Sequence, residues 1–205
     1  MDIGVPLRSF GKVDSEALTY SLLAAGNDVW NEYVERQKSF EVHEQTRSIV
    51  LLFAEVSKWP AVDITKQPGW GRFADIAVPV MHQVIRNWYP PGGTIIRAMA
   101  ARLFAGGRIL PHRDSHPSFA AGHRIHVPIA TNSRVRFMID GRPAQLEVGH
   151  AYEINNQKVH SVMNKGETDR IHFIFDYVPP EVKAGKVAGA AASNGRAIAD
   201  GGRPR

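Results

Sequence analysis

Residues 170–178 have the sequence Arg-Ile-His-Phe-Ile-Phe-Asp-Tyr-Val, in which polar and apolar side chains largely alternate. This alternation predicts a β-strand of which one face packs against an apolar core. Because successive side chains of a strand point to opposite faces, Phe173 and Phe175 share the apolar face. Arg170 and His172 share the other face. An arginine that points inward needs an anion, so this second face is a candidate binding surface.

Seven further short segments rich in β-branched and aromatic residues precede this strand, separated by Gly, Pro, Asn and Asp. These predicted strands are Thr94 to Phe104, Arg108 to Pro111, Arg124 to Ala130, Val135 to Ile139, Ala144 to Val148, Ala151 to Ile154 and His160 to Met163. In residues 123–129, His-Arg-Ile-His-Val-Pro-Ile, Arg124 and His126 share a face opposite the aliphatic side chains. Eight short, mostly antiparallel strands predict a closed or sandwiched roll of two sheets.

The N-terminal part of the chain has apolar residues at helical spacing instead. Between Asp14 and Phe40 this spacing predicts two helices divided at Gly26-Asn27. Either Asp14 or Ser15 is expected to cap the first turn, because both have short side chains with a hydrogen-bond acceptor.

A further helix is predicted to begin near Val78, because Pro79 is tolerated in the first turn of a helix but not in its interior. The expected fold class is therefore mainly β with N-terminal helices (α+β). A single domain is expected over residues 1–182, with a helical region at about 12–90 and a β core at about 94–180.

Residues 183–205 form a tail rich in Gly, Ala and small polar residues, which is expected to be flexible because it can bury little apolar surface. Five basic residues and one acidic residue in this tail account for +4 of the net charge of +5. The rest of the chain is therefore nearly neutral. Although basic proteins often bind nucleic acid, no nucleic-acid partner is expected here, because the predicted domain has no basic excess.

The composition, with 43% hydrophobic and 22% charged residues, is that of a globular protein with one substantial core. The absence of cysteine excludes disulfides, thiolate metal sites and a thiol nucleophile, so His, Asp or Glu must hold any metal. No apolar run approaches the roughly 18 residues that span a bilayer, and the first ten residues lack the features of a signal peptide. A cytoplasmic location without a membrane partner is expected.

The segment Pro111-His112-Arg113-Asp114 is a candidate metal site. His112 and Asp114 lie two residues apart, so in an extended strand they project to the same side and can grip one ion. His160, at the start of another predicted strand, could supply a third ligand. Two histidines and one carboxylate can occupy one face of an octahedral Fe(II) and leave the opposite face open for a cosubstrate and O₂.

A His-x-Asp motif also occurs by chance, so the interpretation depends on Arg170 as well. Its guanidinium matches a carboxylate bidentately and suits the distal carboxylate of 2-oxoglutarate. Arg124 and His126 could help to hold the carboxylate nearer the metal. In the alternative interpretation, Arg124 and Arg170 pair with Asp140, Asp176 or another carboxylate of the sheet.

In this order, the segments resemble the aspartyl/asparaginyl β-hydroxylase-like branch of the iron- and 2-oxoglutarate-dependent dioxygenases, which also contains free-proline hydroxylases. The resemblance covers about Thr94 to Pro180, through PHRD, HRIHVPI, KVHSV and DRIHFIFDYVPP. It implies a double-stranded β-helix core of the jelly-roll or cupin-like kind, with Fe(II) bound by three residues. These residues are His112, Asp114 and His160.

The same resemblance implies that Arg170 binds the distal carboxylate of 2-oxoglutarate and that Arg124 and His126 contribute to the cosubstrate site. In the animal aspartyl hydroxylases of this family, a glycine stands at the position that matches Asp114. The complete triad favours the small-molecule amino-acid hydroxylases. The implied activity is hydroxylation of an unactivated C–H bond of a free amino acid, or of an aspartyl or asparaginyl residue, with conversion of 2-oxoglutarate and O₂ to succinate and CO₂.

An amino acid or acidic peptide substrate carries a carboxylate, which a cation near the mouth of the site would recognise. The candidate cations are Arg97, Arg102, Arg113 and Arg136. His116, in the loop after the metal motif, could also contact the substrate. Arg97 and Arg102 lie on opposite faces of their predicted strand, so one of them at most faces the interior. Arg102 is preferred because it lies closer in sequence to the metal motif. A homodimer is expected only because dimers are the commonest oligomers of soluble proteins.

Two other functions would fit the same fold. A cupin-type enzyme with zinc or manganese would act as a non-redox isomerase or hydrolase. A non-catalytic module would bind a small acid without turnover. The arginine ten residues after His160 argues against the first, and the complete triad argues against the second.

Overall fold

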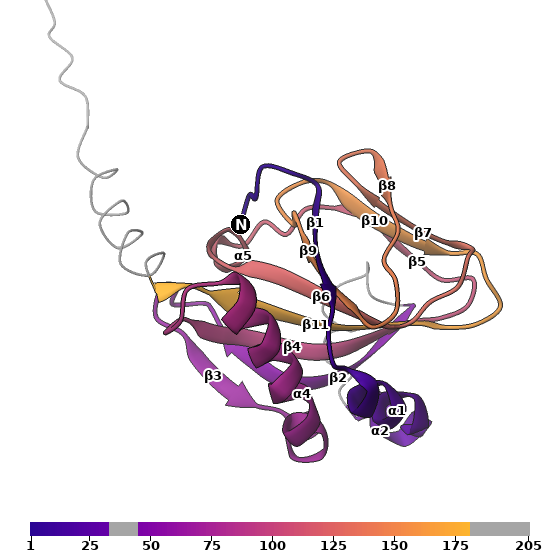
Figure 1. Ribbon diagram of the computed structural model, residues 1–205, viewed down its shortest axis with the longest axis horizontal. Coiled ribbons are helices and arrows are strands. Elements are labelled where there is room, and N and C mark those ends of the chain that lie inside the picture. Colours follow the sequence, from indigo (N-terminus) through magenta and orange to yellow (C-terminus); the bar gives the residue numbers. More distant parts are fainter. Residues whose placement is uncertain (33–44, 181–205) are drawn as a thin grey trace, which may run out of the picture.

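The computed structural model describes residues 1–32 and 45–180, in which two antiparallel β-sheets form the centre of the molecule (Figure 1). The larger sheet has the strand order β1-β9-β6-β11-β4-β2-β3, and the smaller has the order β5-β10-β7-β8. The strands are β1 (Leu7–Lys12), β2 (Thr46–Glu55), β3 (Asp63–Lys66), β4 (Thr94–Leu103), β5 (Arg108–His112), β6 (His123–Ala130), β7 (Val135–Ile139), β8 (Arg142–Ala144), β9 (His150–Ile154), β10 (His160–Asn164) and β11 (Arg170–Val178). The helices are α1 (Glu16–Ala24), α2 (Asn27–Asn31), α4 (Pro68–Trp88) and α5 (Pro117–Ala121).

The outer face of the larger sheet packs against the helices α1, α2 and α4 (Figure 1). Phe173 and Phe175 of β11 are fully buried there and share one apolar core with Trp30 of α2 and Met81 of α4. The aliphatic residues of β6 lie in the same core. The predicted alternation of β6 and β11 is therefore confirmed, because their apolar faces meet the helices.

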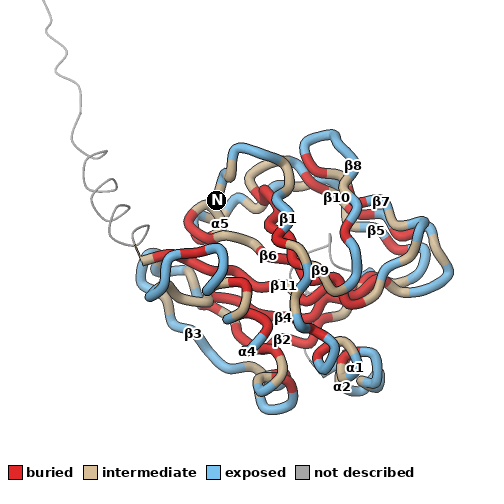
Figure 2. Tube along the Cα trace, in the orientation of Figure 1, coloured by how far each residue is buried: buried red, intermediate tan, exposed pale blue. Residues whose placement is uncertain are grey.

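The inner face of the larger sheet lies opposite the smaller sheet. A second apolar core joins Leu103 of β4 and Ile154 of β9 to Phe137 of β7 and Val162 of β10. Nearly all of β11 is consequently buried, on both faces (Figure 2). Two antiparallel sheets packed in this way form the double-stranded β-helix that the sequence predicted, with few helices.

The helix α4 runs from Pro68 to Trp88, so the prediction that it begins near Val78 was wrong. Pro79 lies inside it on the exposed side. A proline in a helix removes the hydrogen bond to the carbonyl four residues earlier, here that of Asp75. Because Asp75 is exposed, water can satisfy this carbonyl, and the buried residues on both sides of Pro79 form one continuous apolar stripe.

The N-terminal ninety residues also contain three strands, β1, β2 and β3, where only helices were predicted. The two helices divided at Gly26-Asn27 are present as α1 and α2, but Ser15 makes no side-chain cap hydrogen bond. The end of the second predicted helix at Phe40, and the tail at residues 183–205, lie outside the described residues.

The strand predicted at Ala144 to Val148 lies earlier, at Arg142–Ala144. Asp140 and Gly141 both have positive φ angles, 53° and 73°, as a two-residue type I′ hairpin turn requires. The turn brings Ile139 opposite Arg142, so β8 must begin immediately after Gly141.

Gly69 and Gly71 test how tightly α4 packs on the larger sheet. A Cβ atom at Gly69 would lie 2.7 Å from both Ile49 Cγ2 and the carbonyl oxygen of Val50, whereas a Cβ at Gly71 would meet nothing within 4 Å. We expect Gly69→Ala to lower the free energy of unfolding by about 1–3 kcal/mol through overpacking. Gly71→Ala should raise it by up to about 1 kcal/mol through helix propensity. Urea denaturation of both variants measures the free energy of unfolding. If both substitutions changed it in the same direction, the close packing of Gly69 on β2 would be contradicted.

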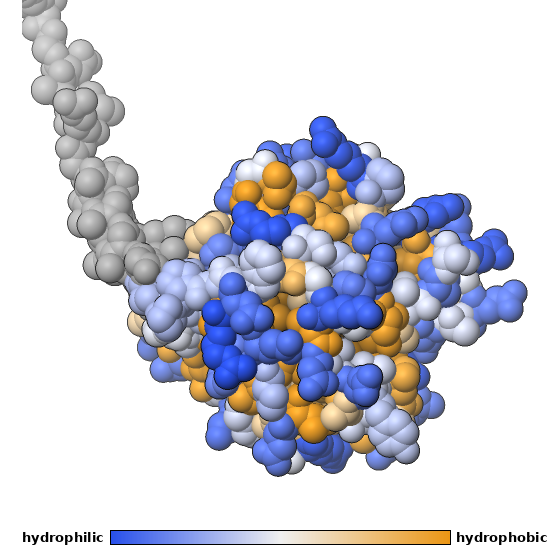
Figure 3. All heavy atoms as spheres, in the orientation of Figure 1, coloured by the Kyte–Doolittle hydropathy of each residue, from blue (hydrophilic) through white to orange (hydrophobic). Residues whose placement is uncertain are grey.

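On the face shown in Figure 3, hydrophilic residues are spread over the surface with hydrophobic residues between them. Within residues 1–32 and 45–180, no helix is both long and apolar enough to cross a membrane.

Candidate active site

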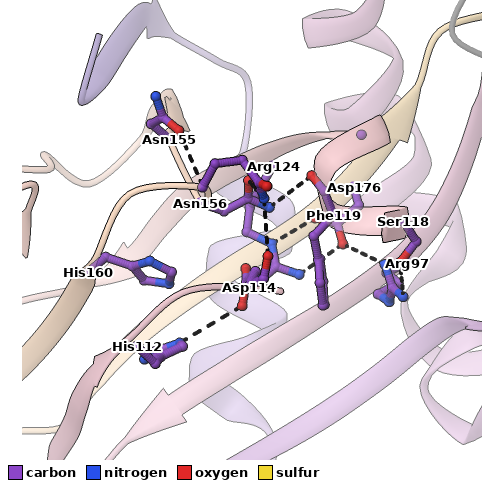
Figure 4. A network of polar contacts seen from close by, with 12 residues as sticks. Arg97, His112, Asp114, Ser118, Phe119, Arg124, Asn155, Asn156, His160 and Asp176 are labelled. Carbon is purple, nitrogen blue, oxygen red and sulfur yellow. Dashed lines mark hydrogen bonds and ion pairs between the residues drawn. The ribbon is translucent and has the colours of Figure 1, made fainter. Parts of the chain in front are cut away.

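The structure brings the three predicted metal ligands together at one end of the smaller sheet (Figure 4). His112 ends β5 and His160 begins β10, and the two are paired across these neighbouring strands. Asp114 lies two residues beyond the end of β5. One potential ligand atom from each residue lies within 4.8 Å of the others, and His112 Nε2 is 3.9 Å from Asp114 Oδ1. This spacing suits a single ion between the three groups.

Backbone contacts orient both imidazole rings. His112 Nδ1 is 2.8 Å from the carbonyl oxygen of Leu110, and His160 Nδ1 is 3.0 Å from that of Lys158. Since a carbonyl only accepts, each Nδ1 carries the proton and donates it, and each Nε2 carries the lone pair that a metal needs. Burial also lowers the pKa of His160, which favours the neutral form that binds metals.

A row of buried charges extends from Asp114 into the larger sheet (Figure 4). Arg124 Nη1 donates to Asp114 Oδ2 at 2.6 Å, and Arg124 also holds both oxygens of Asp176, at 2.8 and 2.9 Å. Although burial alone would lower the pKa of Arg124, these two carboxylates raise it. Arg124 therefore pairs with carboxylates of the protein itself, Asp114 and Asp176, as the alternative interpretation of the sequence predicted. Its guanidinium holds a metal ligand, and its part in binding cosubstrate stays a prediction.

Arg170 is almost completely buried, yet no carboxylate pairs with it among the described residues. Its Nη2 donates to His172 Nδ1 at 2.6 Å, and its Nε has no hydrogen-bond partner in the same part of the chain. Burial lowers its pKa to about 9, so it is still protonated at neutral pH. A buried, unpaired guanidinium is costly unless an anion joins it, so the alternative pairing does not apply to Arg170.

His126 and His172 lie beside Arg170. Because Arg170 can only donate, His172 Nδ1 is an acceptor, and His126 Nδ1 lies 3.1 Å from it. Burial, together with the positive charge of Arg170 and the neighbouring His126, lowers the pKa of His172 well below its ordinary value. His172 is therefore neutral and orients the guanidinium.

One cavity connects these groups. It encloses about 540 Å³ between the atoms, partly open to solvent, and its lining includes His112, His160, Arg124, His126 and Arg170. Two of the predicted metal ligands, His112 and His160, and the three predicted cosubstrate residues thus line one shared space.

A second space, open to solvent, is lined by Arg170 and His172 together with Arg136 and residues of the segment Pro143–Glu147. Arg170 is therefore among the lining residues of both spaces.

Three of the candidate substrate residues lie in different surroundings. Arg102 lines the first cavity, but its guanidinium pairs with Asp169 and lies 5.0 Å from the ring of Trp30. Arg113 is exposed. His116 caps α5, since its Nδ1 accepts from the backbone amide of Ser118 at 3.1 Å.

The preference for Arg102 over Arg97 as the inward residue was wrong. Arg97 is paired with Asp176 across β4 and β11, so it shares the face of the site, and its Nη1 lies 3.3 Å from Asp176 Oδ2. Sequence reasoning considered Arg97 only as a substrate-binding cation and assigned no role to Phe119, whose ring lies 4.4 Å from the Arg97 guanidinium. The run Arg97–Arg102, Arg-Ala-Met-Ala-Ala-Arg, has small residues on both faces, so alternation gave no signal.

Comparison with protein families identifies this arrangement. The family model described as aspartyl/asparaginyl beta-hydroxylase matches residues 9–180. The chain belongs to this family. The match begins before the Thr94 at which the sequence resemblance started, so it includes the N-terminal helices and strands. As an aspartyl/asparaginyl β-hydroxylase family member, the protein is a 2-oxoglutarate oxygenase-like enzyme, and its His-Asp-His triad is consistent with a metal.

Solved structures of oxygenases share the fold of this family member. A viral collagen prolyl hydroxylase from Paramecium Bursaria Chlorella virus-1, in complex with 2-oxoglutarate, matches with a TM-score of 0.55 and 9% identity over 86% of this chain and 97% of that one. HygX from Streptomyces hygroscopicus, with nickel, 2-oxoglutarate and hygromycin B bound, matches with a TM-score of 0.53 and 12% identity over 85% and 83%. A 2OG-Fe(II) oxygenase family oxidoreductase from Burkholderia pseudomallei matches with a TM-score of 0.50 and 14% identity over 66% and 69%. No curated protein sequence gives a significant match.

Proposed function

We propose that this enzyme hydroxylates an unactivated C–H bond of a free amino acid, or of an aspartyl or asparaginyl residue. One atom of O₂ enters the product and the other enters succinate, which forms from 2-oxoglutarate with release of CO₂. Fe(II) would be held by His112, Asp114 and His160 and would supply the oxidising chemistry when bound.

The observation that carries this proposal is the buried Arg170 guanidinium. It lines the same cavity as His112 and His160, and no carboxylate of the described residues neutralises it. A dicarboxylate could bind the metal with one end and Arg170 with the other. 2-Oxoglutarate has a group for each of these contacts. Its distal carboxylate matches the guanidinium of Arg170, and its 2-oxo acid group can chelate the open face of the metal.

The side chains around the cavity have separate tasks in this proposal. His172 is neutral and accepts a hydrogen bond from Arg170. It therefore orients the guanidinium but leaves its positive charge available for the carboxylate of the cosubstrate. The apolar residues Phe137, Val162 and Ile174 line the same cavity and limit the access of water to the bound cosubstrate. The substrate would enter near Arg113 and His116, on either side of Asp114, and both remain predictions.

The decisive experiment adds 2-oxoglutarate without oxygen to protein loaded with Fe(II). A weak visible charge-transfer band is expected, because the 2-oxo acid group chelates the iron. Succinate, which has no oxo group, is the matched control and should give no such band. A zinc-type enzyme or a non-catalytic module would also give none, which would overturn the proposal.

The substrate class follows from succinate release. Under air, free amino acids and short acidic peptides are compared for stimulation of succinate formation, with product hydroxylation measured in parallel. The complete triad favours stimulation by a free amino acid. Succinate formation that no amino acid or acidic peptide stimulates would contradict the proposed substrate class.

A further inference from the structure

Asp114 lies outside any strand, so regular structure does not fix its side chain. β5 ends at His112. Among the described residues, two hydrogen bonds hold the backbone of Asp114: its amide donates to the carbonyl of Asn156 at 3.2 Å, and Gln157 Nε2 donates to its carbonyl at 3.1 Å. His112 and His160, in contrast, are strand residues with anchored rings. Of the three candidate ligands, Asp114 therefore depends most on contacts of its side chain.

The two oxygens of the Asp114 carboxylate have different surroundings. Oδ1 faces His112 Nε2 at 3.9 Å, on the side of the candidate metal position, whereas Oδ2 accepts from Arg124 Nη1 at 2.6 Å. A charge-assisted hydrogen bond of this length is strong and directional. It fixes the rotation of the carboxylate and leaves one oxygen for the ion.

Arg124 is itself fixed by Asp176. The two form a bidentate pair, with Nε and Nη2 of Arg124 on the two carboxylate oxygens. Together with Nη1 on Asp114, every nitrogen of the guanidinium is thus bound to a carboxylate. The fork can therefore reach Asp114 in one orientation only.

Arg97 completes a buried row in which charges alternate. It reaches Asp176 Oδ2 through Nη1 and donates to Ser118 Oγ through Nη2 at 2.9 Å. In Figure 4 the ring of Phe119 lies between the guanidinium groups of Arg97 and Arg124, at 4.4 and 4.5 Å. Two cations and two carboxylates balance, as burial of so many charges requires.

From these contacts we infer that Asp176 and Arg97, acting through Arg124, position the Asp114 carboxylate as a one-oxygen metal ligand. Arg124, Asp176 and Arg97 are positioning residues that do not themselves touch the metal. The inference rests on the proposed metal site but not on any hydroxylation. It also reassigns Arg124 from the cosubstrate, where the family resemblance puts it, to a ligand of the metal.

Titration with Co(II) in the absence of 2-oxoglutarate tests this role, because the visible spectrum of bound cobalt reports its ligand number and geometry. We expect Asp176→Asn to weaken Co(II) binding roughly 10- to 100-fold and to change the spectrum, as loss of a group that orients a metal ligand does. Asp63→Asn makes the same charge change on the exposed strand β3 and should leave both readouts unchanged. Unchanged Co(II) affinity and spectrum in Asp176→Asn would overturn the inference.

A double-mutant comparison separates positioning from general loosening of the fold. In an Asp114→Gly background, adding Asp176→Asn should have no further effect on Co(II) affinity, because the carboxylate that it positions is gone. Fully additive losses would contradict the inference. Should Asp176→Asn fail to fold, Arg124→Lys takes its place, since lysine keeps the charge but lacks the planar fork that holds both oxygens of Asp176 while it reaches Asp114. The same loss of Co(II) affinity is expected, and wild-type affinity would overturn the inference.

Arg124→Gln distinguishes the two roles of this arginine. Positioning predicts weaker Co(II) binding without cosubstrate, whereas a cosubstrate role alone predicts unchanged Co(II) binding and a raised requirement for 2-oxoglutarate. If the wild-type protein binds no Co(II), the proposed function fails; if wild type and all variants bind it equally, only the positioning role fails.

Discussion

His160→Ala should abolish turnover. Without the imidazole, only His112 and Asp114 remain near the candidate metal position, and no other His, Asp or Glu among the described residues belongs to this cluster. The protein should still fold, because the loss of one hydrogen bond to the carbonyl of Lys158 costs only about 1–3 kcal/mol. Fe(II)-dependent succinate formation and Co(II) titration measure the effect.

His150→Ala is the matched control for this variant. His150 also begins a strand, β9, and its Nδ1 also contacts the carbonyl two residues earlier, that of Val148, at 3.3 Å. Because His150 lies outside the metal cluster, its removal should leave turnover intact. Metal-dependent oxidation retained in His160→Ala would show that the triad is not the metal site.

Arg170→Met should raise the concentration of 2-oxoglutarate required for half-maximal turnover by roughly 30-fold or more. Truncating one partner of a buried charge pair costs about 2–5 kcal/mol, and each 1.4 kcal/mol corresponds to a factor of ten. Metal binding should be largely unchanged, because Arg170 is not part of the metal cluster. Arg108→Ala removes an exposed arginine of β5 and is the matched control.

The same variant has a second expected result, in stability. Without cosubstrate, the buried guanidinium has no carboxylate partner among the described residues, so Arg170→Met should be at least as stable as the wild type. In the presence of metal, added 2-oxoglutarate should stabilise the wild type further and the variant much less. Thermal unfolding with and without cosubstrate measures both effects. A wild-type requirement for 2-oxoglutarate in Arg170→Met would remove Arg170 from the cosubstrate site.

The sequence predicted best those strands that have one apolar and one polar face. β6 and β11 largely alternate, so the face that carries Arg124, His126 and Arg170 could be assigned from the pattern of side chains alone. The strand β2 was missed because it is buried on both sides, and Ile49–Phe53 is a continuous apolar run with no period. Buried helices and buried strands look alike in such a run.

The site was predictable where a single residue has a strong chemical requirement. Arg170 on an inward face was predicted to need an anion. No carboxylate of the described residues pairs with it, so a bound ligand can supply that anion. Arg124 had the same requirement, but Asp114 and Asp176 meet it, which only the spatial pairing of β6, β11 and the metal loop shows. Local sequence patterns contain no information on which of two arginines finds a carboxylate within the protein.

The presence of Arg170 in the lining of two spaces has a consequence for inhibitor design. A compound bound in the solvent-open space lined by Arg170, Arg136 and the Pro143–Glu147 segment would compete with the proposed cosubstrate for the same arginine from outside the metal cavity. Such an inhibitor would need no metal-chelating group.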